Sequence, residues 1–271
     1  MRAGGAVTLG EVKAGQGACL FGSAYGVTSA LEDPTRPSYV APFSGVLTSY
    51  SHFAEANPGT IQALVLRAGA DATHKVVVAK SPKQPVVPGT LTTVATRLPI
   101  KAGEHLGIGF SQVGMACFIA TSAADTTFAA APFDADTTSD FASLGPDLTG
   151  GRPNVSAVLE PDVDGDLYGD VSQDLCPQSK LTQAACPAPD TVVAKRPKKR
   201  STKRKVTIAF TSVSGATYTC AVDGKAAAPC SSPYKKRFSY GKHVVLITAT
   251  SPAGIVDPTP VRVRFKVVRP S

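Results

Sequence analysis

Tryptophan is absent from this sequence, and aromatic residues make up only 7% of its 271 positions. No apolar run approaches the ~18 residues that cross a bilayer, which excludes a membrane-spanning helix. Charged residues reach only 18% while hydrophobic residues make up 43%, and this balance excludes wholesale disorder. The 24 glycines and 22 prolines provide many turns, and the length leaves room for about two domains.

Helical periodicity is nearly absent too, because no long window keeps apolar residues at three- and four-residue spacing. Short alternating runs bounded by turn signals recur instead. Eight or nine of these runs predict strands in the first half of the chain, at 6–12, 18–22, 45–53, 60–67, 74–79, 90–97, 106–110, 117–121 and 155–159. We therefore expect an all-β fold that begins with an antiparallel β-sandwich over residues 1–159, jelly-roll-like in its arrangement.

After residue 159 the composition changes abruptly. Residues 160–188 are acidic and then rich in proline and alanine, residues 189–204 are basic, and neither stretch can build a core. Alternation resumes in residues 205–268. Five runs there predict a second, smaller sandwich, at 206–210, 216–222, 234–239, 243–250 and 261–267. The sequence thus predicts two β-domains joined by an acidic connector and a basic linker.

The two parts of the chain have opposite charge. Residues 1–190 contain 11 Lys/Arg and 18 Asp/Glu, a balance of −7, whereas residues 191–271 contain 17 and 2, a balance of +15. Eight of these cations lie between Lys195 and Lys205. Aromatic residues are not interleaved with them, so we expect no sequence-specific nucleic acid binding. The favoured partner is an anionic cell-wall polymer, a lipid surface or the acidic part of the chain; nucleic acid and no partner at all are the alternatives.

Six cysteines occur without the C-x2-C spacing that brings two thiolates to one zinc ion. Their even number predicts disulfides, and pairing between neighbours gives Cys19–Cys117, Cys176–Cys186 and Cys220–Cys230. Oxidised pairs indicate an extracellular or cell-surface location. A signal peptide is not visible in the first 18 residues, which leaves a trimmed or misassigned start as the favoured explanation.

Five aspartates within 13 residues form the strongest local signal. They are Asp162, Asp164, Asp166, Asp170 and Asp174. So many like charges repel one another unless a hard cation gathers them, and Ca²⁺ takes ligands of this kind. In an EF-hand-like loop the first four occupy positions 1, 3, 5 and 9, and the backbone carbonyl of Tyr168 occupies position 7. No helical pattern flanks the loop, which argues against a true EF-hand, and a solvated acidic linker is the alternative.

The same residues resemble a thrombospondin type 3 repeat, whose D-x-D-x-D-G-x-x-D pattern ends in a Cys-Pro beside the last acidic ligand. The match covers residues 160–177 and includes Cys176-Pro177. The sequence departs from the pattern by carrying Leu167 at the usual glycine and by placing Asp174 one residue later. The resemblance implies a connector of an extracellular protein, with Ca²⁺ as its cofactor.

Most of residues 205–268 is similar to the immunoglobulin-like or fibronectin type III-like modules repeated in large bacterial surface proteins. The match rests on A-T-Y-T-C-A-V-D-G-K-A-A-A-P-C and on the later Y-G-K-H-V-V-L-I-T-A-T-S-P-A-G-I-V-D-P-T-P. Within it, Asp223-Gly224 predicts a hairpin turn that a Cys220–Cys230 disulfide would staple. The resemblance implies an architectural role.

Enzyme motifs are weak. The sequence G-F-S-Q-V-G at 109–114 is one residue away from the G-x-S-x-G elbow and has no helix after it. Gly107-Ile-Gly109 lacks the third glycine and the βαβ setting of a dinucleotide site. The four histidines are scattered rather than clustered, at His52, His74, His105 and His243. Structural roles are therefore favoured for all of them.

These observations predict a secreted or cell-surface modular calcium-binding protein, non-enzymatic, for adhesion or for binding an extracellular polymer such as carbohydrate. The alternative is a carbohydrate-binding or hydrolytic accessory protein whose ligand site lies on the N-terminal sandwich. A clustered aromatic platform would favour that alternative. Its candidate residues are Tyr25, Tyr39, Tyr50 and Phe53.

Overall fold

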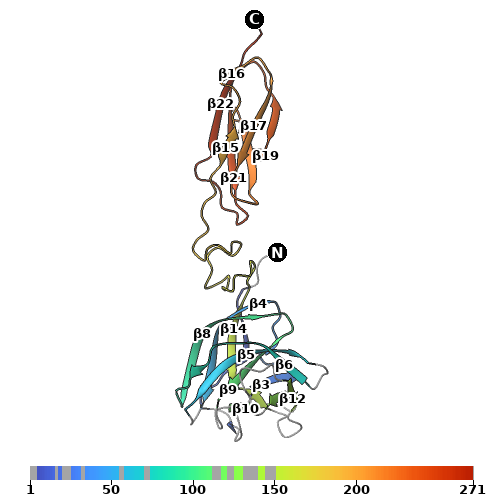
Figure 1. The fold of residues 1–271 in the computed structure, drawn as a ribbon, viewed down its shortest axis with the longest axis vertical. Coiled ribbons are helices and arrows are strands. Elements are labelled where there is room, and N and C mark those ends of the chain that lie inside the picture. The colour runs from blue at the N-terminus through green and yellow to red at the C-terminus, as the bar shows by residue number, and fades with distance from the viewer. Residues whose placement is uncertain are drawn as a thin grey trace. The chain divides into compact units, whose positions relative to one another are not determined.

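The computed structural model describes residues 5–15, 18–19, 26–31, 34–54, 58–69, 74–111, 117–120, 125–130, 140–143 and 151–270. The chain divides into two compact units, Met1–Gln183 and Ala184–Ser271 (Figure 1). Strands are the regular secondary structure of the described residues, which confirms the expected all-β class. None of these residues belongs to a helix long and apolar enough to cross a membrane.

One layer of the N-terminal unit is a four-stranded antiparallel sheet in the order β1-β14-β4-β8. Its strands are β1 (Val7–Glu11), β4 (Gly45–Ala54), β8 (Thr90–Ile100) and β14 (Val155–Glu160). The first and last strands of the unit are neighbours, with Val7 opposite Leu159. All four were expected as strands, and the alternation is clearest in β8 and β14, where buried and less buried residues alternate along most of the strand.

The second layer is a seven-stranded antiparallel sheet in the order β6-β12-β11-β3-β9-β5-β7. Its strands are β3 (Gly26–Leu31), β5 (Thr60–Ala68), β6 (His74–Lys80), β7 (Gln84–Pro85), β9 (His105–Phe110), β11 (Thr126–Ala130) and β12 (Asp140–Ser143). Because β6 also pairs with β5, six of these strands form a closed ring. A small third sheet joins β2 (Ala18–Cys19), β10 (Cys117–Ala120) and β13 (Gly151–Pro153). The sequence did not predict β3, β7, β11, β12 or β13.

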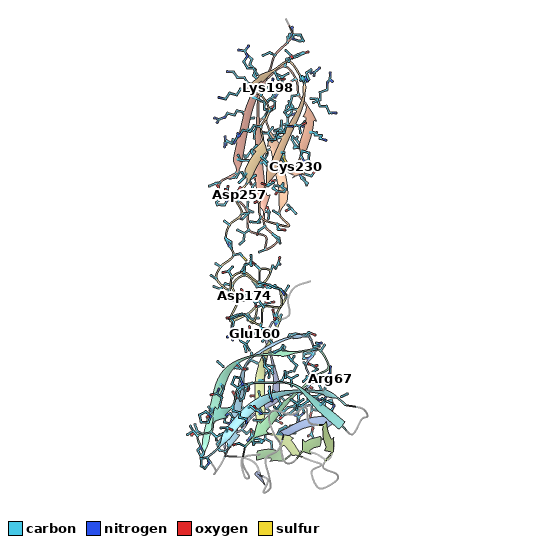
Figure 2. The ribbon with its side chains drawn as sticks, in the orientation of Figure 1. Arg67, Glu160, Asp174, Lys198, Cys230 and Asp257 are labelled. Carbon is cyan, nitrogen blue, oxygen red and sulfur yellow. A yellow bond between two sulfur atoms is a disulfide. The ribbon has the colours of Figure 1, made fainter. Side chains whose placement is uncertain are left out.

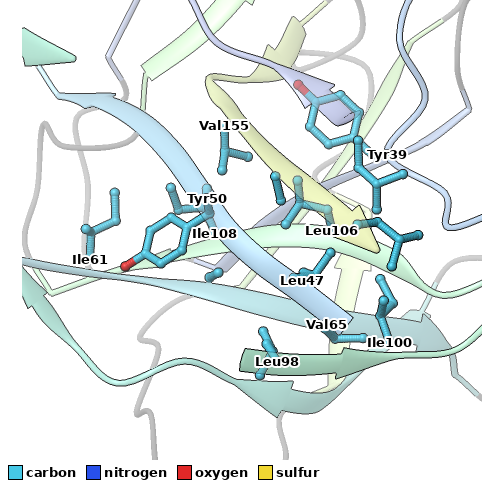
Figure 3. Close-up of a cluster of buried hydrophobic side chains, with 14 of the residues drawn as sticks. Tyr39, Leu47, Tyr50, Ile61, Val65, Leu98, Ile100, Leu106, Ile108 and Val155 are labelled. Atoms are coloured by element: carbon cyan, nitrogen blue, oxygen red, sulfur yellow. The ribbon is translucent and has the colours of Figure 1, made fainter. Parts of the chain in front are cut away.

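The main core of this unit lies between the four-stranded sheet and strands β5 and β9 (Figure 3). Leu47 and Tyr50 from β4, Val65 from β5 and Leu106 from β9 have no exposed surface. Strand β5 is buried on both faces, because Leu64 and the other residues of its opposite face form a second cluster with β6. This explains why the strand appears in the sequence as a continuous apolar run.

The C-terminal unit is a β-sandwich of a three-stranded and a five-stranded sheet. The first sheet has the order β15-β17-β20, formed by β15 (Val192–Lys195), β17 (Lys205–Thr211) and β20 (Tyr234–Arg237). The second has the order β16-β22-β21-β18-β19, formed by β16 (Arg200–Ser201), β18 (Thr217–Val222), β19 (Ala228–Cys230), β21 (Gly241–Thr250) and β22 (Val261–Val267). Every pairing is antiparallel except that of β16 with β22. Phe210, Ile208, Val245 and Ile247 lie at the centre of its core.

The hairpin expected at Asp223-Gly224 is present. Both residues have positive φ, 53° and 76°, which is the conformation that a two-residue type I′ turn requires. The Lys225 N–H closes the turn on the Val222 carbonyl at 3.0 Å. The Cys220–Cys230 disulfide ties the hairpin together, which confirms that predicted pair.

The other cysteines agree with the expected chemistry. Cys176 and Cys186 are both disulfide-bonded. Cys19 and Cys117 are backbone register partners in the β2–β10 pair, a placement compatible with the predicted bridge.

Residues 189–204 do not form the linker that the sequence predicts. They contribute β15 and β16, so they belong to the C-terminal sandwich. Both strands are short and largely exposed, so their residues lack the apolar alternation by which strands are recognised. The connector also divides differently from the expected 160–188, because its residues up to Gln183 belong to the N-terminal unit.

Candidate metal centre

The candidate site is a strand-free segment, residues 161–183, that follows directly on β14. The segment turns back on itself, since the Asp170 N–H donates to the Pro161 carbonyl at 2.9 Å. The Leu175 N–H donates to the Gln183 carbonyl at 2.9 Å and closes a second loop. A composition that cannot build a core therefore still folds, through turns held by side-chain and backbone hydrogen bonds.

The three alternating aspartates converge. Asp162, Asp164 and Asp166 each offer a carboxylate oxygen, and these oxygens lie within 4.8 Å of one another. Each side chain is half-buried, and all three come from five consecutive residues. Hard cations take ligands of this type, so the donor set fits Ca²⁺ and not a thiolate-binding or imidazole-binding metal.

Backbone N–H groups fix these carboxylates. Asp162 accepts hydrogen bonds from the N–H groups of Gly165 at 2.7 Å, Asp166 at 3.1 Å and Leu167 at 3.1 Å. Asp166 in turn accepts the Tyr168 N–H at 2.9 Å. The loop is thus wrapped around its own first carboxylate, the arrangement by which aspartates stabilise turns.

Two residues of the loop have left-handed backbone conformations. Gly165 has φ of 72°, which glycine adopts without steric cost. Leu167 has φ of 70°, although its side chain has a Cβ that disfavours this region. Leu167 stands where the thrombospondin type 3 pattern has a glycine, and its backbone has the left-handed conformation that glycine adopts most easily.

The two later aspartates complete the acidic cluster. Asp170 accepts the Val163 N–H at 3.1 Å, and Asp174 is 2% exposed and accepts the Cys176 N–H at 2.6 Å. Burial, together with the carboxylates of Asp162, Asp174 and Asp164, raises the pKa of Asp170 to about 6. Burial and its acidic neighbours raise the pKa of Asp164 as well. Burial and mutual repulsion thus both disfavour the charged form of these carboxylates.

Two buried oxygens provide the test of whether a cation fits. Within the described residues, Oδ2 of Asp164 and Oδ2 of Asp174 have no hydrogen-bond partner. An unpaired buried carboxylate oxygen is costly, and a bound cation removes that cost. The residues present therefore fit Ca²⁺.

The Tyr168 carbonyl, the sixth predicted ligand, lies between Asp166 and Asp170 in the chain. The Tyr168 ring stacks under Arg97 of β8, with 4.4 Å from Cζ to the ring centroid.

Glu160 is a residue of the candidate site that the sequence analysis missed. It ends β14, is 2% exposed, and accepts the N–H groups of Val171 at 3.0 Å and Ser172 at 2.8 Å. Figure 2 shows Glu160 at the end of the sandwich from which the segment that contains Asp174 continues. A Cβ on Gly169 would lie 2.3 Å from Oε2 of Glu160, so this close approach requires glycine. The only sequence signal was an acidic residue at the end of an alternating strand.

The aromatic platform proposed for a carbohydrate site is wrong for the described residues. Tyr39 and Tyr50 have no exposed surface and Phe53 is 6% exposed, because their rings fill the core. Figure 3 shows Tyr39 and Tyr50 among the other core side chains. Tyr25 lies outside the described residues.

The histidines and Ser111 have structural surroundings. His52 is fully buried, and burial lowers its pKa to about 4. His105 lies 3.1 Å from the Lys75 ammonium, and His243 lies 2.7 Å from the Asp223 carboxylate. Ser111 Oγ accepts the Thr60 N–H at 2.7 Å. The side chain of His74 is outside the described part of the structure.

No family model matches this sequence, and no curated protein matches it. Among solved structures, it is similar to the extracellular domain of the putative one component system BT4673 from B. thetaiotaomicron, with 8% identity and a TM-score of 0.27. The match covers 76% of this chain and 31% of that chain, so this chain spans less than a third of the structure it matches. A likeness of this extent carries no inference about function.

Proposed function

We propose that this protein is a secreted or cell-surface modular protein whose segment 160–183 binds Ca²⁺ and whose two sandwich units serve adhesion or binding rather than catalysis. The observation that carries the proposal is the convergence of the Asp162, Asp164 and Asp166 carboxylates within 4.8 Å, beside a buried Asp174 with an unpaired oxygen. The disulfides support an extracellular setting.

The residues have distinct parts in this proposal. Asp162, Asp164 and Asp166 take the cation, and Asp170, Asp174 and the Tyr168 carbonyl complete its oxygen ligands. Calcium supplies positive charge that relieves the repulsion between these groups. Glu160 is not among the proposed ligands, and its two oxygens accept hydrogen bonds from residues 171–172. Its part is to hold the segment on the end of β14.

Calorimetry on the full chain tests the proposal. We expect one or two calcium ions with a dissociation constant of about 10⁻⁶ to 10⁻³ M, because no helices preorganise the loop. Magnesium should compete weakly, since it demands a smaller octahedral shell. Replacing Asp162, Asp164 and Asp166 by Asn keeps their size and should abolish binding.

The control is Asp190→Asn, which removes an exposed carboxylate from outside the segment and should leave calcium binding unchanged. Protease digestion gives a second readout, because calcium should protect the chain near Asp170. If the protein takes up no calcium at about 5 mM Ca²⁺, a concentration above the dissociation constants of extracellular calcium modules, the proposal is contradicted.

A further inference from the structure

One end of the C-terminal unit carries a concentration of cations. It is the end at which β17 and β21 begin and β20 and β22 finish. We name it the cationic end and define it by Lys198, Lys199, Arg200, Lys203, Arg204, Lys205, Arg237, Lys242, Lys266 and Arg269. All of these side chains are exposed except that of Arg204, which is half-buried. Figure 2 shows Lys198 at this end and Asp257 toward the opposite end of the unit.

Like charges lie directly opposite each other in both sheets at this end. Lys205, the first residue of β17, is the register partner of Arg237, the last residue of β20. On the five-stranded sheet, Lys266 is the partner of Lys242 on one side and of Arg200 on the other. Direct cross-strand pairs of like charge are destabilising. These pairs of cations therefore lack acidic partners that would offset their repulsion.

The acidic residues of the unit do not supply that compensation. Between residues 191 and 271 the sequence has 17 Lys/Arg and only Asp223 and Asp257 as acids. Asp223 accepts hydrogen bonds from His243 and from the Val244 N–H. Asp257 is 2% exposed and is bonded to Thr191 and Thr259. Both carboxylates are thus already engaged, Asp223 in the turn beside the first residues of β21, so two bonded acids stand against 17 cations.

The cations at residues 198–205 are held in place by the backbone rather than carried on a free linker. The Lys199 and Ser201 carbonyls accept hydrogen bonds from the N–H groups of Lys266 and Val268, both at 2.9 Å. The Arg204 carbonyl accepts the Phe238 N–H at 2.9 Å. The segment is therefore bonded to β22 of one sheet and to the residue that follows β20 of the other. A surface fixed in this way loses less entropy on binding than a flexible run of lysines would.

The aromatic ring at this end, that of Tyr240, already contacts two arginine side chains. Tyr240 is 43% exposed, and the guanidinium groups of Arg204 and Arg269 lie over its ring at 5.1 and 5.8 Å. Stacking on the ring orients these two guanidinium groups. The same contacts leave the ring poorly placed to stack with a nucleic acid base.

We propose that the cationic end is a binding surface for a flexible anionic polysaccharide that carries sulfate or phosphate groups. Such groups match the bidentate geometry of arginine and the point charge of lysine. The cations are spread over the ends of two sheets that are packed ~10 Å apart, so a chain that bends can contact both. The inference deepens the binding function proposed above and rests on it for the extracellular setting of the partner.

Two other polyanions fit less well. Double-stranded DNA is stiff over about 150 bp, and a stiff rod reaches fewer cations spread over the ends of two sheets than a chain that bends does. A lipid surface also attracts cations, but inserted apolar side chains strengthen that attachment, and Tyr240 is the exposed large hydrophobic side chain that the described residues place here. Both remain as arms of the test.

The test measures binding of the full chain to heparin, to a 20-bp random DNA duplex and to vesicles with anionic lipid, from about 50 to 300 mM salt, the range in which counterion release weakens such contacts. EDTA is present throughout, so the result does not depend on the calcium site. One variant combines Lys205→Gln, Lys242→Gln and Lys266→Gln. The matched control combines Lys195→Gln, Lys225→Gln and Lys235→Gln, which removes the same charge from the same unit but outside the cationic end.

We expect heparin to bind more tightly than the duplex or the vesicles, at least tenfold weaker binding in the first variant, and less than threefold change in the control. The first variant loses repulsive pairs, so its melting temperature should be no lower than that of the wild type. Equal losses in both variants would show that net charge alone matters and would overturn the proposal. Tighter binding to the duplex or to vesicles would overturn it as well, and so would absence of heparin binding at the lowest salt. Calorimetric calcium binding is read separately, so its failure is distinguishable from failure here.

Discussion

The carboxylate of Glu160 accepts hydrogen bonds from both the backbone N–H of Ser172, at 2.8 Å, and its hydroxyl, at 2.6 Å. This contact joins the last residue of β14 to a loop that has no strands of its own. It explains how an acidic segment, which should repel itself, is fixed to the edge of a folded sandwich.

Replacing Glu160 by Gln should loosen this junction. The amide keeps the volume but loses the charge that strengthens three hydrogen bonds, at a cost of about 2 kcal/mol. Hydrogen exchange at the Val171 and Ser172 amides should therefore accelerate by about 30-fold, as 1.4 kcal/mol corresponds to tenfold. Thr48→Val is the control, because Thr48 reaches the same carboxylate only at 3.4 Å. Unchanged protection in the Gln variant would show that Glu160 does not anchor the segment.

Replacing Leu167 by Gly should strengthen the site. Leu167 holds a φ of 70°, and a non-glycine residue in this region costs about 1 kcal/mol. We expect up to fivefold tighter calcium binding, measured by calorimetry. Val171→Gly serves as the control, because Val171 has no positive φ and glycine there only adds flexibility. Weaker binding in the Leu167 variant would mean that its half-exposed side chain stabilises the loop more than its backbone strains it.

Calcium affinity should fall as the pH is lowered from 7 to 5. The pKa of Asp170 is raised to about 6, so this carboxyl is mostly ionised at pH 7 and mostly protonated at pH 5. A proton then competes with the ion, and this group alone lowers the affinity about tenfold. Without calcium the sign reverses: a carboxyl with a raised folded-state pKa favours folding below its unfolded value of about 3.9 and loses that contribution as the pH rises through 6.

Calorimetry across this pH range checks the prediction, with Asp170→Asn as the matched variant. That variant should bind calcium more weakly at pH 7 and should show a flatter pH profile. Parallel profiles for the two proteins would assign the proton to another group.

The Asp223–His243 pair should make the C-terminal unit sensitive to pH. Burial works to lower the pKa of His243, but the Asp223 carboxylate and the Ser239 carbonyl outweigh it, so the pKa is raised. The stability that this charged pair contributes is therefore complete below the unfolded pKa of about 6.5 and is lost as the pH rises through the higher folded value.

Asp223→Asn should accordingly destabilise the unit by about 1 kcal/mol at pH 5.5 and by less at pH 9. Asparagine tolerates the left-handed conformation at this position, so the turn itself should persist. The measurement is urea unfolding at both pH values, with hydrogen exchange of the β21 amides as the probe of the C-terminal unit. Asp190→Asn is the control. A loss of stability that is the same at both pH values would exclude the ion pair as its cause.

The sequence predicted those parts of the fold in which local pattern and tertiary environment agree. The runs that became β8 and β14 alternate because one face of each strand is more buried than the other, so their period is readable without a structure. Asp223-Gly224 was identifiable because only a few residue types adopt two successive positive φ values. The spacing of Asp162, Asp164 and Asp166 predicted their convergence, since a chain that turns within five residues brings alternate side chains together.

Other features depended on contacts between distant residues, which no local pattern records. Strand β16 exists because β22 offers it a free edge, and its exposed Arg200 and half-buried Ser201 carry no signal of their own. Tyr39 and Tyr50 are buried because the four-stranded sheet packs on β5 and β9. Their residue type alone suggested an exposed aromatic platform, which they do not form.

The all-β class, the turn chemistry and the density of carboxylates and cations could be predicted from the sequence, because they depend on residue type and on spacing over a few positions. Which charges lie together depends instead on contacts between distant parts of the chain. Glu160 meets Ser172 because the chain folds back across the end of β14, and Lys205 and Arg237 become neighbours because β17 pairs with β20 in one particular register. Register is fixed by burial of one face of each strand, a constraint that acts across the whole unit rather than along the chain.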